Sequence, residues 1–362
     1  MLRHVDAPEH RRLGISGTKV RVRAEAPARV NLIGDHTDYA GGYVLPMAID
    51  RSTTVDLRRH GDAVEMVSAG SPRAAHVPLG ITEPEAPRSP DWSRYVAGVV
   101  VALRPHEGGS GVMTSTVPPG AGLSSSSALT VAVALALGFE GTALELARLC
   151  QRAETLGSGV PGGIMDQLCS AAATAGHALL IDCTTLAVRP VAVPDACEVI
   201  VAHCGVARSL VGSAYADRRR DVELAAAELG PLGVAGADAW TELADPLLRR
   251  RARHVISENA RVLACAAALD DDDPATAGHL MSESHASLRE DFNVSTADLD
   301  SVVAELQGLP GAYGARLTGA GFGGCAVALA EAGTLQRAGG LPSRREAWVV
   351  RAVDGATVTA VG

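Results

Sequence analysis

The sequence predicts a two-domain protein that combines β-strands with α-helices, and three observations support this. The 362 residues exceed the roughly 250 to 300 residues at which a single hydrophobic core usually stops growing. The first sixty residues contain short stretches with the alternating polarity of strands. Long stretches with helical spacing fill the second half of the chain. A cleft between the two domains is the natural place for a binding site.

The first half is expected to be rich in strands at its start and in helices further along. The expected strands span residues 18–24, 44–49, 53–58 and 111–117. The expected helices span residues 91–103, 125–137, 143–156 and 164–173. Prolines and acids at residues 80–91 predict a surface loop, and the glycines of residues 157–163 predict a break between the last two helices.

The second half is expected to begin with strands and to continue as helices before a final sheet. The expected strands span residues 177–182, 198–203, 314–318, 325–330 and 348–353, and the expected helices span 214–229, 244–269 and 275–290. The acids of residues 270–274 predict a solvated turn, and the basic residues 249–254 predict a solvated helix face in preference to a partner site.

Composition excludes several classes of protein. The chain is 47% hydrophobic and 20% charged, and no apolar run approaches the roughly 18 residues that a membrane span needs. The formal net charge of −9 argues against a nucleic-acid surface. Residues 1–12 lack the apolar segment of a secretory signal, so we expect a cytoplasmic location. Seven cysteines without a Cys-x-x-Cys pair predict reduced core thiols rather than a metal or redox site.

The cationic residues restrict the chemistry further, because Lys19 is the only lysine among 32 lysines and arginines. The chain therefore has no Gly-x-x-x-x-Gly-Lys-Ser/Thr loop, no strand lysine of the protein-kinase type and no plausible Schiff-base lysine. Any nucleotide phosphates must be held in another way.

A polar segment at residues 28–46 lies between two apolar runs and has the chemistry of a polyol site. Asp35, His36 and Asp38 can exchange hydrogen bonds with several hydroxyls, and Arg29 adds a planar cation with five donors. A buried site of this kind rejects an analogue that lacks one hydroxyl, because its own polar groups would then be unpaired. His36 has no second histidine at ligand spacing, so hydrogen bonding is a better explanation for it than metal binding.

A second segment, residues 120–127, reads Gly-Ala-Gly-Leu-Ser-Ser-Ser-Ser and opens an expected helix. Its glycines would let backbone N–H groups turn outward, and the helix N-terminus adds partial positive charge, so the segment predicts a phosphate cradle that needs no lysine. A serine-rich helix cap is the alternative for this segment taken alone. A third glycine-rich segment, residues 319–325, predicts either close approach of a ligand or a tight turn between strands.

Two acids, Glu154 and Asp166, lie on either side of the break at residues 157–163, which could return the chain so that both face one cleft. Isolated acids are usually solvated, which is the alternative for each. Asp166 lies near a helix start among apolar residues: the helix dipole stabilises its carboxylate, whereas apolar surroundings raise its pKa. Tyr215, followed by Arg218 to Arg220, is either a ligand contact or a half-buried helix tyrosine.

These segments together resemble the galactokinases of the GHMP small-molecule kinase family. Residues 28–46 resemble the sugar-binding signature, with Asp35 where members usually carry Glu, and residues 118–127 and 319–325 resemble the second and third GHMP motifs, with Ala320 for a more usual Gly. Residues 150–154, 163–167, 213–215 and 283–291 resemble other galactokinase segments. The resemblance implies an α+β, two-domain GHMP fold of mixed sheets and helices, with an N-terminal domain over residues 1–190, a C-terminal domain over 191–362, and the active site in the cleft between them.

The resemblance also implies a reaction and its residues. The chain is expected to transfer the γ-phosphoryl group of ATP to the C1 hydroxyl of α-D-galactose in the Leloir pathway of galactose catabolism. Asp166 is expected to accept the hydroxyl proton and Arg29 to stabilise the transferred charge. Mg²⁺ is expected on Ser126 and Glu154. The expected contacts with the sugar are Asp35, His36, Thr37, Asp38 and Tyr215. The expected contacts with ATP are Gly120, Ala121, Gly122, Leu123, Ser124, Ser125 and Ser126.

Two other functions are compatible with the same motifs. A kinase of this family could act on an N-acetylated, uronic or pentose sugar with a galactose-like hydroxyl pattern, because Asp35 is one methylene shorter than Glu. A galactokinase-like sensor could bind galactose and ATP without turnover, although a sensor has no need for the complete set of Arg29, Glu154 and Asp166. The expected partners are galactose and ATP, without nucleic acid or membrane. A monomer is expected, with a homo-oligomer as the alternative.

Overall fold

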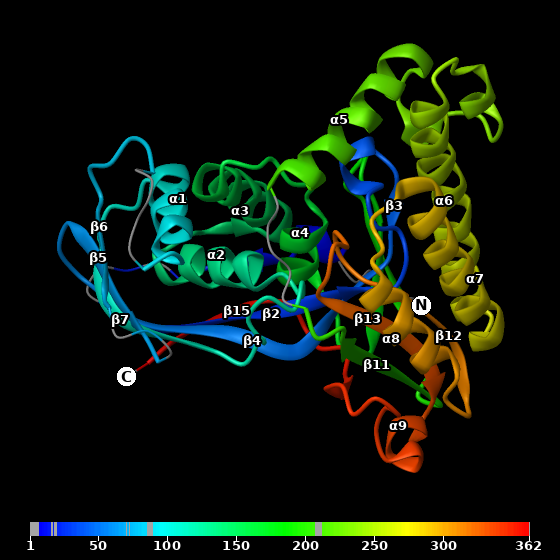
Figure 1. The fold of residues 1–362 in the computed structure, drawn as a ribbon. Helices are drawn as coiled ribbons and strands as arrows, with labels where there is room; N and C mark the ends of the chain where they lie inside the picture. The colour runs from blue at the N-terminus through cyan, green and yellow to red at the C-terminus, as the bar shows by residue number, and fades with distance from the viewer. Residues whose placement is uncertain are drawn as a thin grey trace, which may run out of the picture.

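The computed structural model describes residues 7–361, except for 16, 18, 19, 70, 72, 85–89 and 207–211 and the side chains of 212 and 213. The following therefore lie outside the described residues: Lys19, the first half of the segment 1–12 considered for a secretory signal, the start of the expected strand 18–24 and part of the expected loop 80–91. The chain forms two lobes, each built around its own sheet (Figure 1).

The first lobe is a six-stranded sheet with four helices on one face (Figure 1). The strand order is β15-β2-β4-β7-β5-β6, with all neighbours antiparallel except β5 and β7. The strands are β2 (Arg21–Asn31), β4 (Pro46–Arg59), β5 (Ala63–Ser68), β6 (Ala75–Pro78), β7 (Gly109–Ser115) and β15 (Thr357–Ala360). The helices are α1 (Ser93–Leu103), α2 (Ser125–Ala136), α3 (Ala143–Ser158) and α4 (Met165–Ala172).

Side-chain polarity explains why this sheet is covered on one face. The first half of β2 alternates exposed residues with the buried Val22, Ala24 and Ala26, as expected for an antiparallel strand with one wet face. Helix α2 consists mainly of Ala, Val and Leu and is buried from residue 127 to its end, which makes it the central helix of the lobe. Helix α3 begins with a capping box between Thr142 and Glu145.

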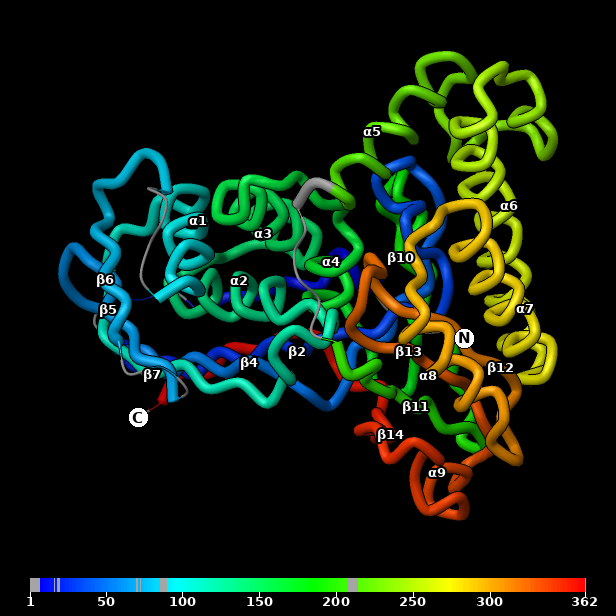
Figure 2. Tube along the Cα trace, in the orientation of Figure 1, coloured from blue at the N-terminus to red at the C-terminus, as the bar shows by residue number. Residues whose placement is uncertain are grey.

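The second lobe is an antiparallel sheet with the order β12-β13-β11-β14, packed against long helices (Figure 2). Helices α6 and α7 lie side by side at the right edge of both views. The strands are β11 (Cys197–His203), β12 (Ala312–Leu317), β13 (Cys325–Glu331) and β14 (Ala347–Val350). The helices are α5 (Gly212–Leu229), α6 (Pro246–Asp270), α7 (Pro274–Ser287), α8 (Ala297–Gln307) and α9 (Thr334–Ala338).

Smaller elements complete the described fold. The remaining strands are β1 (Arg12–Leu13), which pairs with β8 (Gly141–Thr142), and β3 (Tyr43–Val44), which forms a sheet with β9 (His177–Asp182) and β10 (Val188–Ala192). The short helical turns are η1 (Pro8–His10), η2 (Asp38–Ala40), η3 (Leu232–Val234), η4 (Ala239–Glu242) and a π-helix, η5 (Leu288–Phe292).

The end of strand β2 belongs to the core of the second lobe. Leu32 and Ile33 pack in one buried cluster with Cys265 and Val327, although they follow a strand of the first sheet. Strand β15, the last of the chain, returns to pair with β2 in the first sheet. The expected domain limit between residues 190 and 191 lies inside β10 and stays a prediction.

Most expected elements are confirmed, and a few expectations were wrong. Residues 44–49 were expected as a separate strand, but residues 46–59 form the single long strand β4. The helix expected to reach residue 290 ends at Ser287 and continues as the π-helix η5. The basic face of residues 249–254 is only partly solvated, because Arg251 and His254 are buried and hydrogen-bonded inside the second lobe. Hydrophobic spacing alone could not reveal these polar partners.

All seven cysteines are free thiols, as expected. Within the described part of the chain, no helix combines the length and the apolar character that crossing a membrane requires.

Candidate active site

A cavity of about 540 Å³ lies between the two lobes. Most of its lining comes from the first lobe, and Tyr215, Gly319, Ala320 and Phe322 reach it from the second. The sequence motifs that lie far apart in the chain therefore meet around one space.

The glycine-serine segment forms the turn that leads into helix α2. Gly120 and Gly122 have φ values of 70° and 75°, and Ser124 has a φ of 61°, a left-handed conformation that is uncommon for a residue with a side chain. The first backbone N–H groups of an α-helix have no partner within the helix, so the start of α2 presents donors to the cavity. Ser125 and Ser126 line the cavity at this point.

Two of the seven expected ATP contacts do not line the cavity. Ala121 and Leu123 are each 1% exposed and pack in the core of the second lobe. The carbonyl of Leu123 accepts a hydrogen bond from the backbone N–H of Arg29 at 3.3 Å. Buried and more exposed residues alternate in this turn, which explains the difference. The apolar side chains of Ala121 and Leu123 anchor the loop in the core, while the residues on either side of them face the cavity.

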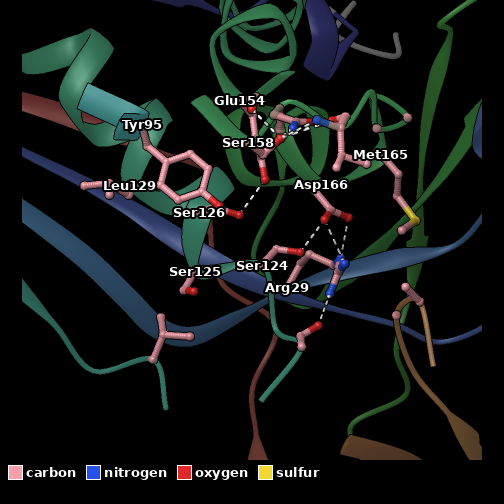
Figure 3. Close-up of a pocket in the computed structure, with 18 of the residues that line it drawn as sticks. Arg29, Tyr95, Ser124, Ser125, Ser126, Leu129, Glu154, Ser158, Met165 and Asp166 are labelled. Carbon is pink, nitrogen blue, oxygen red and sulfur yellow. Dashed lines mark hydrogen bonds and ion pairs between the residues drawn. The ribbon is translucent and has the colours of Figure 1, made fainter. Parts of the chain in front are cut away.

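Arg29, Asp166 and Ser124 form one hydrogen-bonded cluster on the cavity wall (Figure 3). Arg29 Nε donates to Asp166 Oδ1 at 2.7 Å, and its NH2 group donates to Asp166 Oδ2 at 2.8 Å. Ser124 Oγ also donates to Asp166 Oδ2, and Arg29 NH1 donates to the carbonyl of Gly122 at 3.0 Å. The fork of Arg29 therefore fixes the carboxylate in one orientation.

The placement of Arg29 has a local cause in the sheet. The register between β2 and β4 shifts between Pro27 and Arg29. Proline has no N–H to give to the ladder, and such irregularities re-aim the side chains that follow them. Burial alone would lower the pKa of Arg29, but the Asp166 carboxylate outweighs this and raises the pKa above its ordinary value.

Glu154 on α3 faces the start of α2. Its carboxylate accepts a hydrogen bond from Ser126 Oγ at 2.5 Å (Figure 3). It also accepts hydrogen bonds from Ser127 Oγ at 2.8 Å and Gln167 Nε2 at 2.7 Å. Burial raises the pKa of Glu154, and these hydrogen bonds act in the opposite direction. The structure thus brings the two expected metal ligands, Ser126 and Glu154, into direct contact.

This pair fits a magnesium ion that is shared with a nucleotide. Within the described residues, no group of three or more His, Cys, Asp or Glu side chains is arranged to hold a metal. Mg²⁺ usually keeps waters and binds to one or two carboxylates together with substrate phosphates, so a single carboxylate beside a hydroxyl is the donor set that such a site needs.

The sugar signature forms a turn at the boundary between the lobes. Asp35, His36 and Asp38 line the cavity, as does Tyr215 from α5. Thr37 does not, because it is fully buried and its hydroxyl is shared between two carbonyl acceptors, with Oγ1 lying 2.8 Å from the oxygen of Gly34 and 2.6 Å from that of Tyr43. Thr37 therefore closes the turn instead of contacting a ligand.

His36 has a φ of 67° and partners on both ring nitrogens. Its Nδ1 lies 2.9 Å from the Tyr39 hydroxyl and its Nε2 lies 3.2 Å from the carbonyl oxygen of Ala320. A neutral imidazole that donates from Nε2 and accepts at Nδ1 satisfies both contacts. The ring also packs 4.6 Å from that of Phe292 and 5.8 Å from that of Tyr215.

Asp38 is a strongly perturbed acid of the cavity. Burial, followed by repulsion from Asp166, raises its pKa from 3.8 to about 7. Gly163, in the loop before α4, packs directly against it: a Cβ added at Gly163 would lie 1.5 Å from Asp38 Oδ2. Burial also raises the pKa of Asp35, while Arg316 and Arg29 lower it.

The third glycine segment packs against the glycine-serine turn. A Cβ at Gly319 would lie 3.1 Å from the carbonyl oxygen of Gly122, and one at Gly324 would lie 3.0 Å from that of Ala121. Ala320 does not have a positive φ, whereas Phe322 does, so the substitution of Ala for Gly at position 320 causes no backbone strain.

Several cavity residues were not identified from the sequence. Opposite Asp166, an apolar wall consists of Trp92, Tyr95, Met113 and Leu129, and Figure 3 shows Tyr95 and Leu129 beside Ser126. The sequence predicted these residues only as parts of the helices 91–103 and 125–137 and of the strand 111–117, without a role in binding. Tyr39 could have been found, because it follows Asp38 inside the sugar signature.

Comparisons with known proteins agree with this geometry. The galactokinase galactose-binding signature matches residues 15–59, the GHMP kinases N terminal domain matches 94–174, and the GHMP kinases C terminal domain matches 265–339. The chain is 45% identical over 341 residues to galactokinase from Roseiflexus sp. (strain RS-1), covering 88% of this chain and 86% of that one. It is 42% identical over 339 residues to galactokinase from Bos taurus, covering 89% and 86% of the two chains.

Solved structures are similar over nearly the whole length. The crystal structure of Lactococcus lactis galactokinase complexed with galactose has a TM-score of 0.84 at 29% identity, covering 94% of this chain and 95% of that one. The mevalonate kinase of Methanococcus jannaschii has a TM-score of 0.66 at 18% identity, covering 92% and 98%, and shares the fold. With a galactokinase-specific signature, both GHMP domains and relatives of more than 40% identity over most of its length, the chain belongs to the galactokinase family of GHMP kinases.

Proposed function

We propose that this sugar kinase transfers the γ-phosphoryl group of ATP to the C1 hydroxyl of α-D-galactose, giving α-D-galactose 1-phosphate and ADP. The observation that carries the proposal is the cluster of Arg29, Asp166 and Ser124, which lies in one cavity with the start of α2. The relative from Lactococcus lactis was crystallised with galactose, which supports the choice of sugar. The product would enter galactose catabolism by the Leloir pathway.

Asp166 would hold the C1 hydroxyl and accept its proton. Its Oδ2 already accepts hydrogen bonds from Arg29 and Ser124, whereas Oδ1 accepts one from Arg29. A carboxylate oxygen can accept two hydrogen bonds, so Oδ1 is the atom that we assign to the sugar hydroxyl. Arg29, charged at every working pH, would favour ionisation of the hydroxyl and stabilise the charge on the transferred group.

The nucleotide would lie along the opposite part of the cavity. The backbone N–H groups of the turn at residues 120–126 and the start of α2 would bind phosphates. The base would pack against the apolar wall of Trp92, Tyr95, Met113 and Leu129.

Ser126 and Glu154 would hold Mg²⁺ together with the phosphates. A magnesium ion held there would supply positive charge that offsets the negative charge developing on the phosphates during transfer. Glu154 also keeps the hydroxyls of Ser126 and Ser127 in place through hydrogen bonds.

Asp35, Asp38 and Tyr215 would contact the sugar hydroxyls. Both His36 nitrogens already have protein partners, so we assign His36 to positioning Tyr39, which also lines the cavity. The seven cysteines are free thiols, which supports a location in the reducing environment of the cytoplasm. We propose that the protein works as a monomer.

The variant Asp166→Asn tests the assignment of the proton acceptor. We expect kcat to fall by about 10² to 10⁴, the usual contribution of a positioned general base, because the amide cannot accept the proton. Galactose binding measured by calorimetry is expected to change little, since the amide still accepts from Arg29. Unchanged turnover by a folded variant would contradict the role of Asp166.

A further inference from the structure

The turn at residues 32–36, within the sugar signature, is held by one arginine of the second lobe. Arg316 on β12 is fully buried, with an exposed fraction of 0%. Its NH2 group donates to Asp35 Oδ2 at 2.6 Å and its NH1 group donates to the carbonyl of Leu32 at 3.2 Å. The other carboxylate oxygen, Asp35 Oδ1, accepts from the backbone N–H of Gly319 at 3.1 Å. Both oxygens of Asp35 are therefore fixed.

A second acid supports the arginine from behind. Glu258 on α6 lies 3.9 Å from Arg316 NH1, accepts the backbone N–H of Gly34 at 3.0 Å and accepts Arg261 Nε at 2.8 Å. Although burial opposes ionisation, Arg261 and Arg316 lower the pKa of Glu258 to about 2. The backbone of Gly34 is thus bound to Glu258 and the side chain of Asp35 to Arg316, and both partners lie more than 200 positions further along the chain.

We propose that Arg316 is a positioning residue for sugar recognition: it fixes the Asp35 carboxylate against the second lobe so that Asp35 presents its free lone pairs to the sugar in one orientation. The inference rests on the proposed function, because it takes Asp35 as a sugar contact. Asp35 is shorter than the Glu that the family usually carries, so its reach into the cavity depends on where this anchor holds it.

Stability alone does not account for this arginine. A buried ion pair often contributes little net stability, because removing two charges from water offsets their attraction. Arg316 Nε is also buried without a hydrogen-bond partner among the described residues, which is a further cost. The buried guanidinium of Arg316 therefore costs stability, and it lies where it determines the orientation of the Asp35 carboxylate.

The test compares Arg316→Met with Arg59→Met. Arg59 is a matched control: it is 4% exposed, donates to the carbonyls of Ala136 and Leu135, and does not line the cavity. We expect R316M to raise the KM for galactose at least tenfold while the KM for ATP changes less than twofold. R59M is expected to leave both KM values within twofold, even if it lowers the melting temperature. Equal changes in both KM values, or an unchanged KM for galactose, in folded R316M would overturn the proposal.

A second variant covers the case in which R316M does not fold. Arg316→Gln keeps a neutral donor for Asp35 and loses the fork, so the KM for galactose is expected to rise at least threefold with the KM for ATP unchanged. Equal changes in the two KM values, or an unchanged KM for galactose, in folded R316Q would overturn the proposal.

A double-mutant cycle with Asp35→Asn tests whether Arg316 acts through Asp35. The D35N/R316M variant is expected to lose much less galactose affinity than the product of the two single effects, because both substitutions remove the same contact between Arg316 and Asp35. Multiplicative effects would overturn the proposal. If the unmodified protein does not phosphorylate galactose, the proposed function has failed; if it does and R316M keeps its galactose KM, only the present inference has failed.

Discussion

Asp38→Asn separates what this acid does for binding from what it does for stability. The ordinary pKa of 3.8 becomes about 7 in the folded protein, mainly through burial and then through repulsion by Asp166. Between about pH 4 and pH 7 the unfolded chain has released this proton while the folded protein retains it. The free energy of unfolding therefore falls as the pH rises through that interval, and above pH 7 the loss is constant.

The size of the effect follows from the two pKa values. One pKa unit corresponds to about 1.36 kcal/mol, so the carboxylate costs the folded protein up to about 4 kcal/mol at pH 8 and about 1.5 kcal/mol at pH 5. Asparagine avoids this cost and can still accept the backbone N–H of Tyr39. We expect D38N to unfold at a higher temperature than the parent protein, with a clearly larger gain at pH 8 than at pH 5.

Thermal unfolding without ligands at the two pH values measures this gain. Asp62→Asn is the control, because Asp62 is exposed and lies outside the cavity. The same D38N variant is expected to bind galactose at least tenfold more weakly at pH 8, where the parent carboxyl group is ionised, since the amide removes a charged acceptor. A gain that is equal at pH 5 and pH 8, or a loss of stability at pH 8, would refute the reasoning about burial.

Three further substitutions test other parts of the cavity. Gly163→Ala would place a Cβ 1.5 Å from Asp38 Oδ2, so the KM for galactose should rise at least tenfold. Gly162→Ala is the control, because a Cβ at position 162 would meet open space. Equal KM values for the two variants would contradict the packing of Gly163 against Asp38. Glu154→Gln should raise the Mg²⁺ concentration for half-maximal rate about tenfold or more, and an unchanged Mg²⁺ titration would exclude Glu154 as a ligand. Trp92→Ala should raise the KM for ATP several-fold with little change in that for galactose, whereas the reverse pattern would show that the base lies elsewhere.

The sequence predicted the members of the cavity better than their orientations. The contacts of Arg29 with Asp166 and of Ser126 with Glu154 join residues 137 and 28 positions apart, and the resemblance to family motifs was sufficient to select all four. The inward orientation of Leu123 and Thr37 was not predictable, because it depends on which side of a turn meets a core that forms from distant segments.

Partners supplied by distant elements explain the other differences. Arg316 lies 281 positions from Asp35 in the sequence, within a strand whose pattern indicates only a buried position. His36 received its two partners from Tyr39 and from the backbone of Ala320, and a backbone acceptor leaves no trace in residue type. The helix periodicity around residue 290 did not reveal the π-helix, because a single inserted residue changes the spacing only locally.

The most direct test of the proposed reaction is ADP release from ATP and Mg²⁺ with galactose, 2-deoxygalactose, N-acetylgalactosamine, galacturonate, arabinose and glucose, with the product position determined by phosphorus NMR. The account predicts rapid turnover of galactose to an anomeric phosphate and no turnover of glucose. Turnover of another sugar in place of galactose would contradict the proposed specificity, and galactose binding without ADP release would contradict the catalytic role of Asp166 and Arg29.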